Sequence, residues 1–346
     1  MTPVEALERV VHCLDRAHDT GFKAKAFVRA LEAVRALPDH EVRARSAAGT
    51  LTEIDGIGSS SAKVVHEAIA AEADGSAMPY LAALEASTQV PLTADGAPYR
   101  RALRGDLHLH SRWSDGGAPI ARMVRTAIEL GHEYVVVTDH SPRLTVAHGL
   151  DAVRLAAQLE EIEALRRQVA PFRILTGIEV DILEDGSLDH PDDVLAGLDL
   201  VIASVHSKLK MPSTQMTERM LRAVEHPHVD VLGHCTGRLI GSRPPSEFDA
   251  DAVFTACAGS GTAVEINCRP ERLDPPADLL ARAVALGCWF SIDSDAHSTG
   301  QLEWQPLGCD RAAAAGVPLH RVINTLSADE LLAWTRRPLG PDGTRR

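Results

Sequence analysis

From residue 105 onward, short runs rich in β-branched and apolar residues alternate with longer stretches of helical periodicity. Strands that alternate with helices form parallel β/α units with right-handed crossovers. The predicted strands are Gly105–His110, Tyr134–His140, Arg173–Glu179, Leu198–His206, Val229–His234, Thr262–Asn267 and Cys288–His297. Helical patterns such as Ile120–Leu130, Ala152–Val169 and Pro276–Leu286 lie between them. Seven such units within residues 105–340 predict an α/β fold with a closed or nearly closed barrel, and an open doubly wound sheet is the alternative.

Residues 1–87 have a different pattern and are predicted to be all-helical. Apolar residues recur at helical spacing over Val4–Leu14 and again over Phe27–Leu37. Further along, Gly56-Ile57-Gly58 joins two helical patterns, and exposed N–H groups at the start of the second helix could bind a phosphate. Residues 88–104 show no periodicity, and we interpret them as a linker between two domains.

Composition limits the possible partners of the chain. The net charge of −13 over 346 residues argues against nucleic-acid binding by overall charge, although bound cations and local patches can oppose it. With 6 Phe, 3 Tyr and 4 Trp, a base-stacking platform is not expected. No membrane span or signal peptide is indicated. The six cysteines form no close pair, which indicates reduced thiols and a cytoplasmic protein. We favour a monomer.

Potential metal ligands lie in or next to the carboxyl ends of six of the seven predicted strands. In a β/α barrel these ends face one mouth, so residues far apart in the sequence converge there. A single His-x-His pair is a weak signal, but burying many imidazoles and carboxylates together without cations would be costly. The candidates are His108, His110, Asp115, His140, Glu179, His206, His234, Asp295 and His297.

Nine ligands are too many for one ion, so we expect two or three divalent cations, which could be Zn²⁺, Mn²⁺ or Fe. Such clusters activate water and position the oxygens of a phosphate ester, which is therefore the predicted substrate. The residues predicted to hold substrate oxygens are Lys208, Arg238, Arg243, Asn267 and Arg269. Arg238 and Asp295 are the predicted catalytic residues. No GxSxG motif or Walker loop is present, which argues against a serine nucleophile and P-loop chemistry.

Three further carboxylates sit one or two residues from predicted ligands, namely Asp106, Asp139 and Asp293. Such carboxylates often hold the tautomer of a ligating imidazole. They could equally cap the turns that follow the strands. The sequence leaves these two interpretations open.

Seven segments resemble, in order, the motifs of the polymerase-and-histidinol-phosphatase (PHP) superfamily, and in particular the C-terminal PHP domain of bacterial family X DNA polymerases. They are DLHLHSRWSD, VVTDHSPRL, GIEVDIL, ASVHSK, VLGHCTGRLIGSR, EINCRPERLD and SIDSDAHS. The resemblance covers about residues 100–340 and implies a distorted seven-stranded β/α barrel with a trinuclear metal site. By this resemblance one metal takes His108, His110, Glu179 and Asp295, a second takes Glu179, His206 and His234, and a third takes Asp115, His140 and His297.

Residues 1–87 resemble the N-terminal helix–hairpin–helix domain of the same polymerases. This implies a contact with DNA through Gly56, Gly58, Ser59 and Lys63. Only residues 88–104 separate the two halves, so the polymerase palm is missing between them and polymerase activity is not expected. In some members a lysine forms a Schiff base with an abasic sugar. Val64 occupies that position here, and Lys63 lies about 100° away around a helix, which argues against lyase activity.

Three functions follow as hypotheses. The first is a metal-dependent phosphoesterase that acts on DNA, as a 3′–5′ exonuclease or a repair enzyme that removes 3′ blocking groups. The second is a small-molecule phosphomonoesterase of the histidinol-phosphatase type, which the barrel alone supports equally well. The third is a non-catalytic protein that binds DNA ends.

Overall fold

The computed structural model describes residues 1–336, so residues 337–340, which we assigned to the barrel, lie outside the described part. The chain forms two compact units. One comprises Met1–Val90 with Thr299–Gln301, and the other comprises Pro91–Ser298 with the residues from Leu302 onward.

The first unit is built from five α-helices and one short 3-10 helix. They are α1 (Pro3–Arg16), α2 (Phe22–Arg35), α3 (Asp39–Ala48), η1 (Leu51–Glu53), α4 (Ser59–Asp74) and α5 (Pro79–Ser87). Helix α1 begins with a capping box in which Thr2 and Glu5 bind each other's backbone N–H groups. Before α4, Gly56 has φ +87°, a left-handed conformation that favours glycine in this turn. The apolar residues of the predicted helical repeats, such as Leu7 and Val64, form the core.

The second unit is a barrel of seven parallel strands paired in the order of the sequence. The strands are β1 (Gly105–Asp106), β2 (Tyr134–Val137), β3 (Arg173–Asp181), β4 (Leu200–Ser204), β5 (Val231–Leu232), β6 (Ala263–Asn267) and β7 (Trp289–Asp293). A parallel bridge between Leu109 and Ala296, just beyond β1 and β7, brings the two edges together. The predicted barrel is thereby confirmed, and the alternative of an open doubly wound sheet is wrong, because sequential pairing carries the chain around in one direction.

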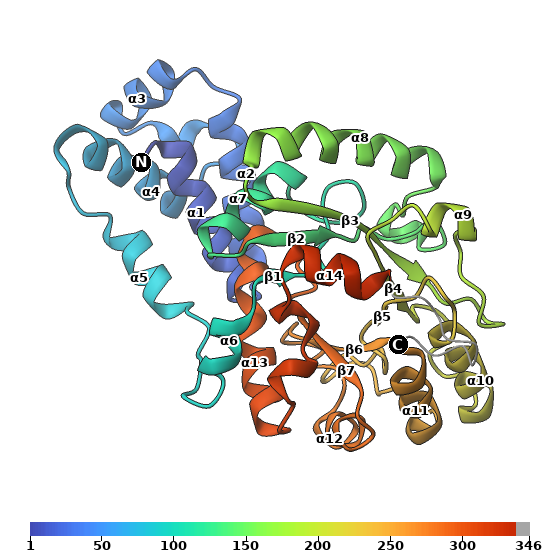
Figure 1. Cartoon of the computed structure of the whole chain (residues 1–346). Helices are drawn as coiled ribbons and strands as arrows, with labels where there is room; N and C mark the ends of the chain where they lie inside the picture. Colours follow the sequence, from blue (N-terminus) through green and yellow to red (C-terminus); the bar gives the residue numbers. More distant parts are fainter. Residues whose placement is uncertain (337–346) are drawn as a thin grey trace. The chain divides into compact units, whose positions relative to one another are not determined.

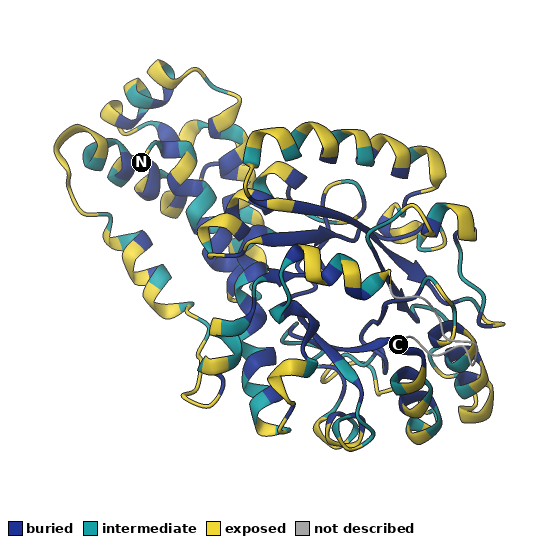
Figure 2. Cartoon of the chain, in the orientation of Figure 1, coloured by how far each residue is buried: buried dark blue, intermediate teal, exposed yellow. Residues whose placement is uncertain are grey.

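Helices surround the strands of the barrel (Figure 1). The barrel unit contains α6 (Ala97–Ala102), α7 (Ile120–Glu129), α8 (Ala152–Val169), α9 (Asp192–Leu195), α10 (Ser213–Val224), α11 (Ala250–Ser260), α12 (Ala277–Ala285), α13 (Gln305–Ala314) and α14 (Ala328–Thr335). Figure 2 shows buried strands and helices such as α8 with exposed outer faces. Residues of β2 alternate accordingly: Val135 and Val137 pack with α7 and α8, whereas Tyr134 and Val136 share a core with Trp334 of α14.

Several strands are shorter than predicted. After β1, the N–H of Leu107 donates to Asp293 Oδ1 (3.0 Å) and the N–H of His108 donates to Asp106 Oδ1 (3.3 Å). Carboxylates thus replace the neighbouring strand as hydrogen-bond acceptors, so β1 ends before its two histidines. In residues 88–104, which we interpreted as a linker without periodicity, the segment Ala97–Ala102 forms helix α6.

Two further expectations concern the cysteines and membranes. All six cysteines are buried and none is in a disulfide. None of the helices in the described residues combines the length and the apolarity needed to cross a membrane.

Candidate metal centre

The nine predicted ligands all lie at the mouth formed by the carboxyl ends of the strands. Most of them lie a few residues beyond the end of a strand, at the face of the barrel where such strand ends converge. His108 and His110 follow β1, His140 follows β2, Glu179 lies in β3, His206 follows β4, His234 follows β5, Asp295 and His297 follow β7, and Asp115 lies in the loop after His110. Asp295 has φ +51°, a strained conformation for a non-glycine residue of the kind that functional sites retain.

Glu179 lies at the centre of this group and is buried. Its Oε1 lies 2.9 Å from His234 Nε2 and 3.3 Å from His206 Nε2. Its Oε2 lies 2.8 Å from His140 Nδ1 and 3.4 Å from His108 Nε2. One carboxylate therefore faces imidazoles from four different strand ends, the arrangement expected of a ligand shared between neighbouring ions.

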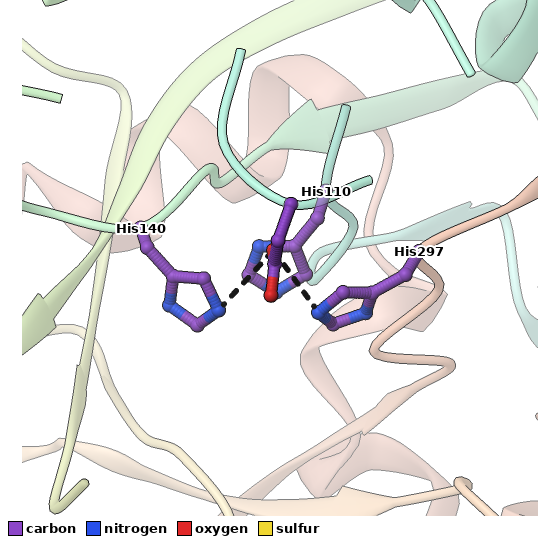
Figure 3. Close-up of side chains that lie close together, drawn as sticks. His110, His140 and His297 are labelled. Carbon is purple, nitrogen blue, oxygen red and sulfur yellow. Dashed lines mark ion pairs between the residues drawn. The ribbon is translucent and has the colours of Figure 1, made fainter. Parts of the chain in front are cut away.

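A second group is shown in Figure 3, where the rings of His110, His140 and His297 point toward one another. Asp115 Oδ1 lies 3.4 Å from His297 Nε2 and 3.6 Å from His140 Nε2. One ligand atom from each of these four residues lies within 4.8 Å of the others, so the four could hold one cation. Beside them, Asp295 Oδ1 lies 3.3 Å from His110 Nε2, and His108, His110 and Asp295 form another such group.

The polar atoms of these residues fit divalent cations because many of them lack hydrogen bonds. Both oxygens of Glu179, both ring nitrogens of His110 and of His206, and Nε2 of His108 are buried without a hydrogen-bond partner in the described residues. Leaving so many buried polar atoms unsatisfied is costly unless a ligand binds them. Imidazole and carboxylate together suit Zn²⁺, Mn²⁺ or Fe.

The charges of the candidate ligands keep some of them in the protonation states that bind cations. Burial would raise the pKa of Glu179, but the imidazoles of His206, His108 and His140 outweigh burial and hold its pKa well below the usual range. Burial, and then His297 and His140, hold the pKa of His110 well below its usual value, so its ring is neutral as metal binding requires.

His206 behaves differently. Burial lowers its pKa, but the Glu179 and Asp181 carboxylates outweigh burial and raise the pKa to about 9. Without a cation the ring therefore holds a proton, and a bound cation would take the place of that proton.

Sequence reasoning missed three charged residues at the mouth. Glu265 of β6 accepts from the N–H of His234 through Oε2 (2.5 Å), and its Oε1 lies 2.6 Å from His108 Nδ1. Asp181 Oδ1 lies 3.4 Å from His206 Nδ1. Arg272 Nε lies 3.4 Å from Asp295 Oδ2. Glu265 could have been found, because an acid in the middle of a buried strand needs a partner.

The three carboxylates beside the ligands bind backbone and hydroxyl groups more than imidazoles. Asp139 accepts from the N–H and hydroxyl groups of Ser111 and Ser114. Asp293 accepts from the N–H of Leu107 and from Asn324 Nδ2, while Asp106 accepts from the N–H groups of His108 and Ser294. These contacts agree with the interpretation in which the three carboxylates cap the turns after the strands, and not with the one in which they hold imidazole tautomers.

Of the five residues predicted to hold substrate, two touch the candidate ligands. Asn267 Nδ2 donates to Asp295 Oδ2 (3.1 Å). Arg269 Nη1 donates to the Asp295 carbonyl (3.0 Å) and lies 2.7 Å from His297 Nδ1. Both side chains therefore lie beside the candidate ligands, and their role in holding substrate stays a prediction.

The other three are engaged elsewhere. Arg238 donates to the carbonyls of Arg272 (2.7 Å) and Leu273, because these carbonyls lack strand partners in the loop after β6. Arg243 Nε donates to the Gly237 carbonyl (2.7 Å). Lys208 Nζ lies 3.7 Å from Glu184 Oε1. Arg238 thus uses Nε and Nη2 to hold this loop, and its catalytic role stays a prediction.

The predicted DNA-contacting residues lie around the start of α4 in the first unit. Gly58 and Ser59 line a hollow of about 250 Å³ together with Phe22 and Lys23. Lys63 lies one turn into α4, where its Nζ is 3.9 Å from Glu67 Oε1. Gly56 forms the preceding turn.

The fold and the mouth define a β/α-barrel hydrolase of the metal-dependent class. A model of the PHP domain matches residues 106–268. The chain is 41% identical over 235 residues to "DNA polymerase/3'-5' exonuclease PolX" of Bacillus subtilis, an alignment that covers 68% of this chain and 41% of that protein. The chain thus spans less than half the length of this relative. It is also 31% identical over 234 residues to a probable phosphatase of Shewanella oneidensis, which covers 63% of this chain and 86% of the relative.

The chain belongs to the PHP domain family. It is a metal-dependent phosphoric ester hydrolase whose cofactors are divalent metal ions, which leaves the non-catalytic hypothesis without support. Among solved structures, histidinol phosphate phosphatase from Lactococcus lactis, complexed with zinc, L-histidinol and phosphate, is similar with a TM-score of 0.45 and 19% identity. That similarity covers 62% of this chain and 94% of that chain.

Proposed function

We propose that the protein hydrolyses phosphoester bonds at the 3′ ends of DNA, releasing nucleotides or removing blocking groups in the cytoplasm during repair. The observation that carries this proposal is that one chain combines the nine candidate ligands of the mouth with a helical unit in which a glycine turn leads into the start of helix α4. The relative from Bacillus subtilis, whose name includes a 3′–5′ exonuclease, supports it. The polymerase part of that name is not carried over, because only residues 88–104 separate the two domains.

In this proposal the residues of the mouth have separate roles. Divalent cations, when bound, would activate water and offset charge on the phosphoryl oxygens. Glu179 and the six imidazoles would hold those cations, with Asp115 and Asp295 as further ligands. Arg269 and Asn267 would orient the phosphoryl group beside Asp295. The positive charge of Arg272, 3.4 Å from Asp295, would add to the attraction for the substrate.

The helical unit would hold the DNA backbone. At the start of α4 the first N–H groups have no intrahelical acceptor, and such a helix end favours a phosphate. The hollow beside it brings Lys23 next to Gly58 and Ser59, and the ring of Phe22, which is 81% exposed, lines the same hollow. In a chain with a net charge of −13, this local arrangement would outweigh the overall repulsion at short range.

The decisive assay measures mononucleotide release from a 3′-labelled DNA strand with Mn²⁺. We expect release by the natural chain and loss of it in His108→Ala, because His108 lies between Glu179, Glu265 and Asp295. The matched control is His320→Ala, which changes an exposed histidine. Equal release by His108→Ala would contradict the site, and absence of release by every variant would contradict DNA as the substrate.

The second candidate is a phosphatase for a small monoester of the histidinol phosphate type. The specific observation in its favour is that a relative named as a probable phosphatase is matched over 86% of its length, compared with 41% for the polymerase relative. Cleavage of a small monoester would need the barrel mouth but not the start of α4.

Gly58→Glu separates the two candidates. A Cβ at Gly58 meets nothing within 4 Å, so the side chain fits and places a negative charge at the start of α4. If DNA is the substrate, DNA hydrolysis falls about tenfold or more while p-nitrophenyl phosphate turnover is unchanged. Gly58→Ala is the uncharged control. A small-monoester phosphatase instead cleaves its ester equally in all three chains and cuts no DNA.

A further inference from the structure

A cavity of about 590 Å³ lies beside the candidate metal centre within the barrel unit. It is lined by Arg112, Trp113, Ser114, Pro142, Thr145, His148, Gly149 and Arg154. Ser114 immediately precedes the candidate ligand Asp115, and Pro142 lies two residues after the candidate ligand His140. The cavity therefore lies between the loops that follow β1 and β2, which also carry these two candidate ligands. Its volume is in the range of about 300–1,000 Å³ typical of sites for small molecules.

The walls of this cavity are fixed to each other and to the metal centre. Arg154 donates to the carbonyl of Trp113 in one loop and to the carbonyls of His148 and Gly149 in the other, the last at 3.1 Å. The N–H of Leu150 then donates to the His140 carbonyl (2.7 Å). A Cβ at Gly149 would lie 1.8 Å from the Ser141 carbonyl oxygen, so only glycine allows this close approach.

The lining residues favour an anionic or aromatic group and disfavour a cation. Two guanidinium groups line the cavity and no carboxylate does. Arg112 is exposed, and apart from the bond of Nε to the Gly117 carbonyl (3.1 Å) its guanidinium makes no hydrogen bond within residues 1–336. Trp113 is half-buried. It packs against the apolar core of the barrel unit, its Nε1 donates to Glu161 (2.8 Å), and part of its surface lines the cavity, where a planar group could contact it.

We propose that this cavity binds the nucleoside of the nucleotide whose phosphate is hydrolysed. This inference rests on the proposed function and deepens it, because it names the part of the substrate that the enzyme selects. The base would stack on Trp113, and Arg112 would bind its carbonyl edge or the next phosphate of the strand. A substrate whose leaving group carries an ammonium, such as histidinol phosphate, would meet two guanidinium groups here and be disfavoured.

The test measures binding of three phosphonates, whose C–P bonds are not hydrolysed, to the full chain loaded with Mn²⁺ by isothermal titration calorimetry. The probes are the phosphonate analogue of thymidine 5′-monophosphate, methylphosphonate and 2-aminoethylphosphonate. We expect the thymidine analogue to bind at least about tenfold more tightly than methylphosphonate, since base stacking on one aromatic residue typically contributes that much. We expect 2-aminoethylphosphonate to bind no more tightly than methylphosphonate.

Variants of the cavity then test which residues cause the tighter binding of the thymidine analogue. Trp113→Ala should remove the preference for the thymidine analogue, Trp113→Phe should keep most of it, and Arg112→Ala should reduce it several-fold. Binding of methylphosphonate should stay unchanged in all of them, which reports an intact mouth. If Trp113→Ala loses methylphosphonate binding through misfolding, Arg112→Ala decides, because its side chain is exposed.

Two results would overturn the proposal: equal binding of the thymidine analogue and methylphosphonate, or a preference that survives both Trp113→Ala and Arg112→Ala. Because these probes need no hydrolysis, a Trp113-dependent preference in a protein that cuts no DNA would contradict the proposed function alone. DNA hydrolysis without any such preference would contradict this inference alone.

Discussion

The helical unit and the mouth of the barrel fill their interiors in opposite ways. In the helical unit, buried positions such as Leu7, Val10 and Val64 are apolar, and their burial is favourable without any ligand. At the mouth, buried positions are imidazoles and carboxylates, and many of their atoms lack hydrogen bonds. The core of the first region therefore needs no ligand to satisfy its buried groups, whereas the mouth needs bound cations for a satisfied interior.

The strongest way to break this comparison is to remove the central carboxylate. We expect Glu179→Gln to lower metal content and to reduce phosphoester hydrolysis at least about a hundredfold. Even the loss of a residue that only hydrogen-bonds a metal ligand typically lowers metal affinity or activity about 10–100-fold. Metal per chain is measured by mass spectrometry and hydrolysis with p-nitrophenyl phosphate. The matched control is Glu184→Gln, whose side chain is 58% exposed. Full metal content in Glu179→Gln would show that the mouth does not depend on this residue for its cations.

The opposite test enlarges a cavity in the helical unit. Leu7 is completely buried in α1, so Leu7→Ala should cost about 2–5 kcal/mol of stability. Hydrogen exchange, resolved by peptide, should show faster exchange in α1 and α4, with metal content and p-nitrophenyl phosphate turnover unchanged. Val28→Ala, at a position that is 40% exposed in α2, should have little effect. Loss of metal in Leu7→Ala would mean that the two regions are not energetically separate.

A more precise test of the mouth concerns Glu265. Its oxygens contact His108 Nδ1 and the N–H of His234. In Glu265→Gln the amide places a second donor against one of these groups, and we expect metal affinity to fall about 10–100-fold. Competition with a metal-binding dye measures this change, and Glu225→Gln on the surface serves as the control. Unaltered affinity would assign Glu265 to the barrel core instead of the metal centre.

The convergence of the mouth could be predicted from the sequence because topology alone determines it. Once β-rich runs and helical stretches alternate, strand ends such as His140, His206 and His234 must face one side. The strand lengths could not be predicted, since β1 ends where the Asp293 carboxylate takes the N–H of Leu107, a contact between distant parts of the chain.

The role of single side chains was harder to predict for the same reason. Arg238 lies four residues after His234 in the sequence, but its guanidinium binds carbonyls of the loop after β6. Glu265 was missed because only the residues at the carboxyl ends of the strands were considered as ligands, whereas Glu265 lies inside β6. Every residue of β6 is buried, and an acid there requires a partner. Patterns in the sequence predict which end of a strand a residue occupies, but they do not predict which nearby loop competes for its hydrogen bonds.

The smallest expected effect concerns the loss of stability at low pH. It distinguishes the contribution of the mouth from that of another buried imidazole in the barrel unit. His132 follows α7, is 6% exposed, and neither ring nitrogen has a hydrogen-bond partner within residues 1–336. Burial, with a smaller contribution from Arg100, lowers the pKa of His132 to about 3. Because this pKa is below that of an unfolded histidine, protonation favours unfolding, and the stability that neutral His132 allows is lost as the pH falls from about 6.5 toward 3.

Replacing this ring by an apolar side chain should therefore flatten the pH dependence of stability. We expect the free energy of unfolding of His132→Leu, measured by urea titration between pH 6 and pH 4, to fall less steeply than that of the natural chain by about 1.4 kcal/mol per pH unit. His320→Leu, at an exposed position, should keep the natural slope. The acid sensitivity left in His132→Leu then belongs mainly to the carboxylates and imidazoles of the mouth, and it should decrease when saturating Mn²⁺ holds them in their metal-binding protonation states. A slope in His132→Leu equal to that of the natural chain would mean that the ring is already hydrated and that burial alone does not distinguish it from the imidazoles of the mouth.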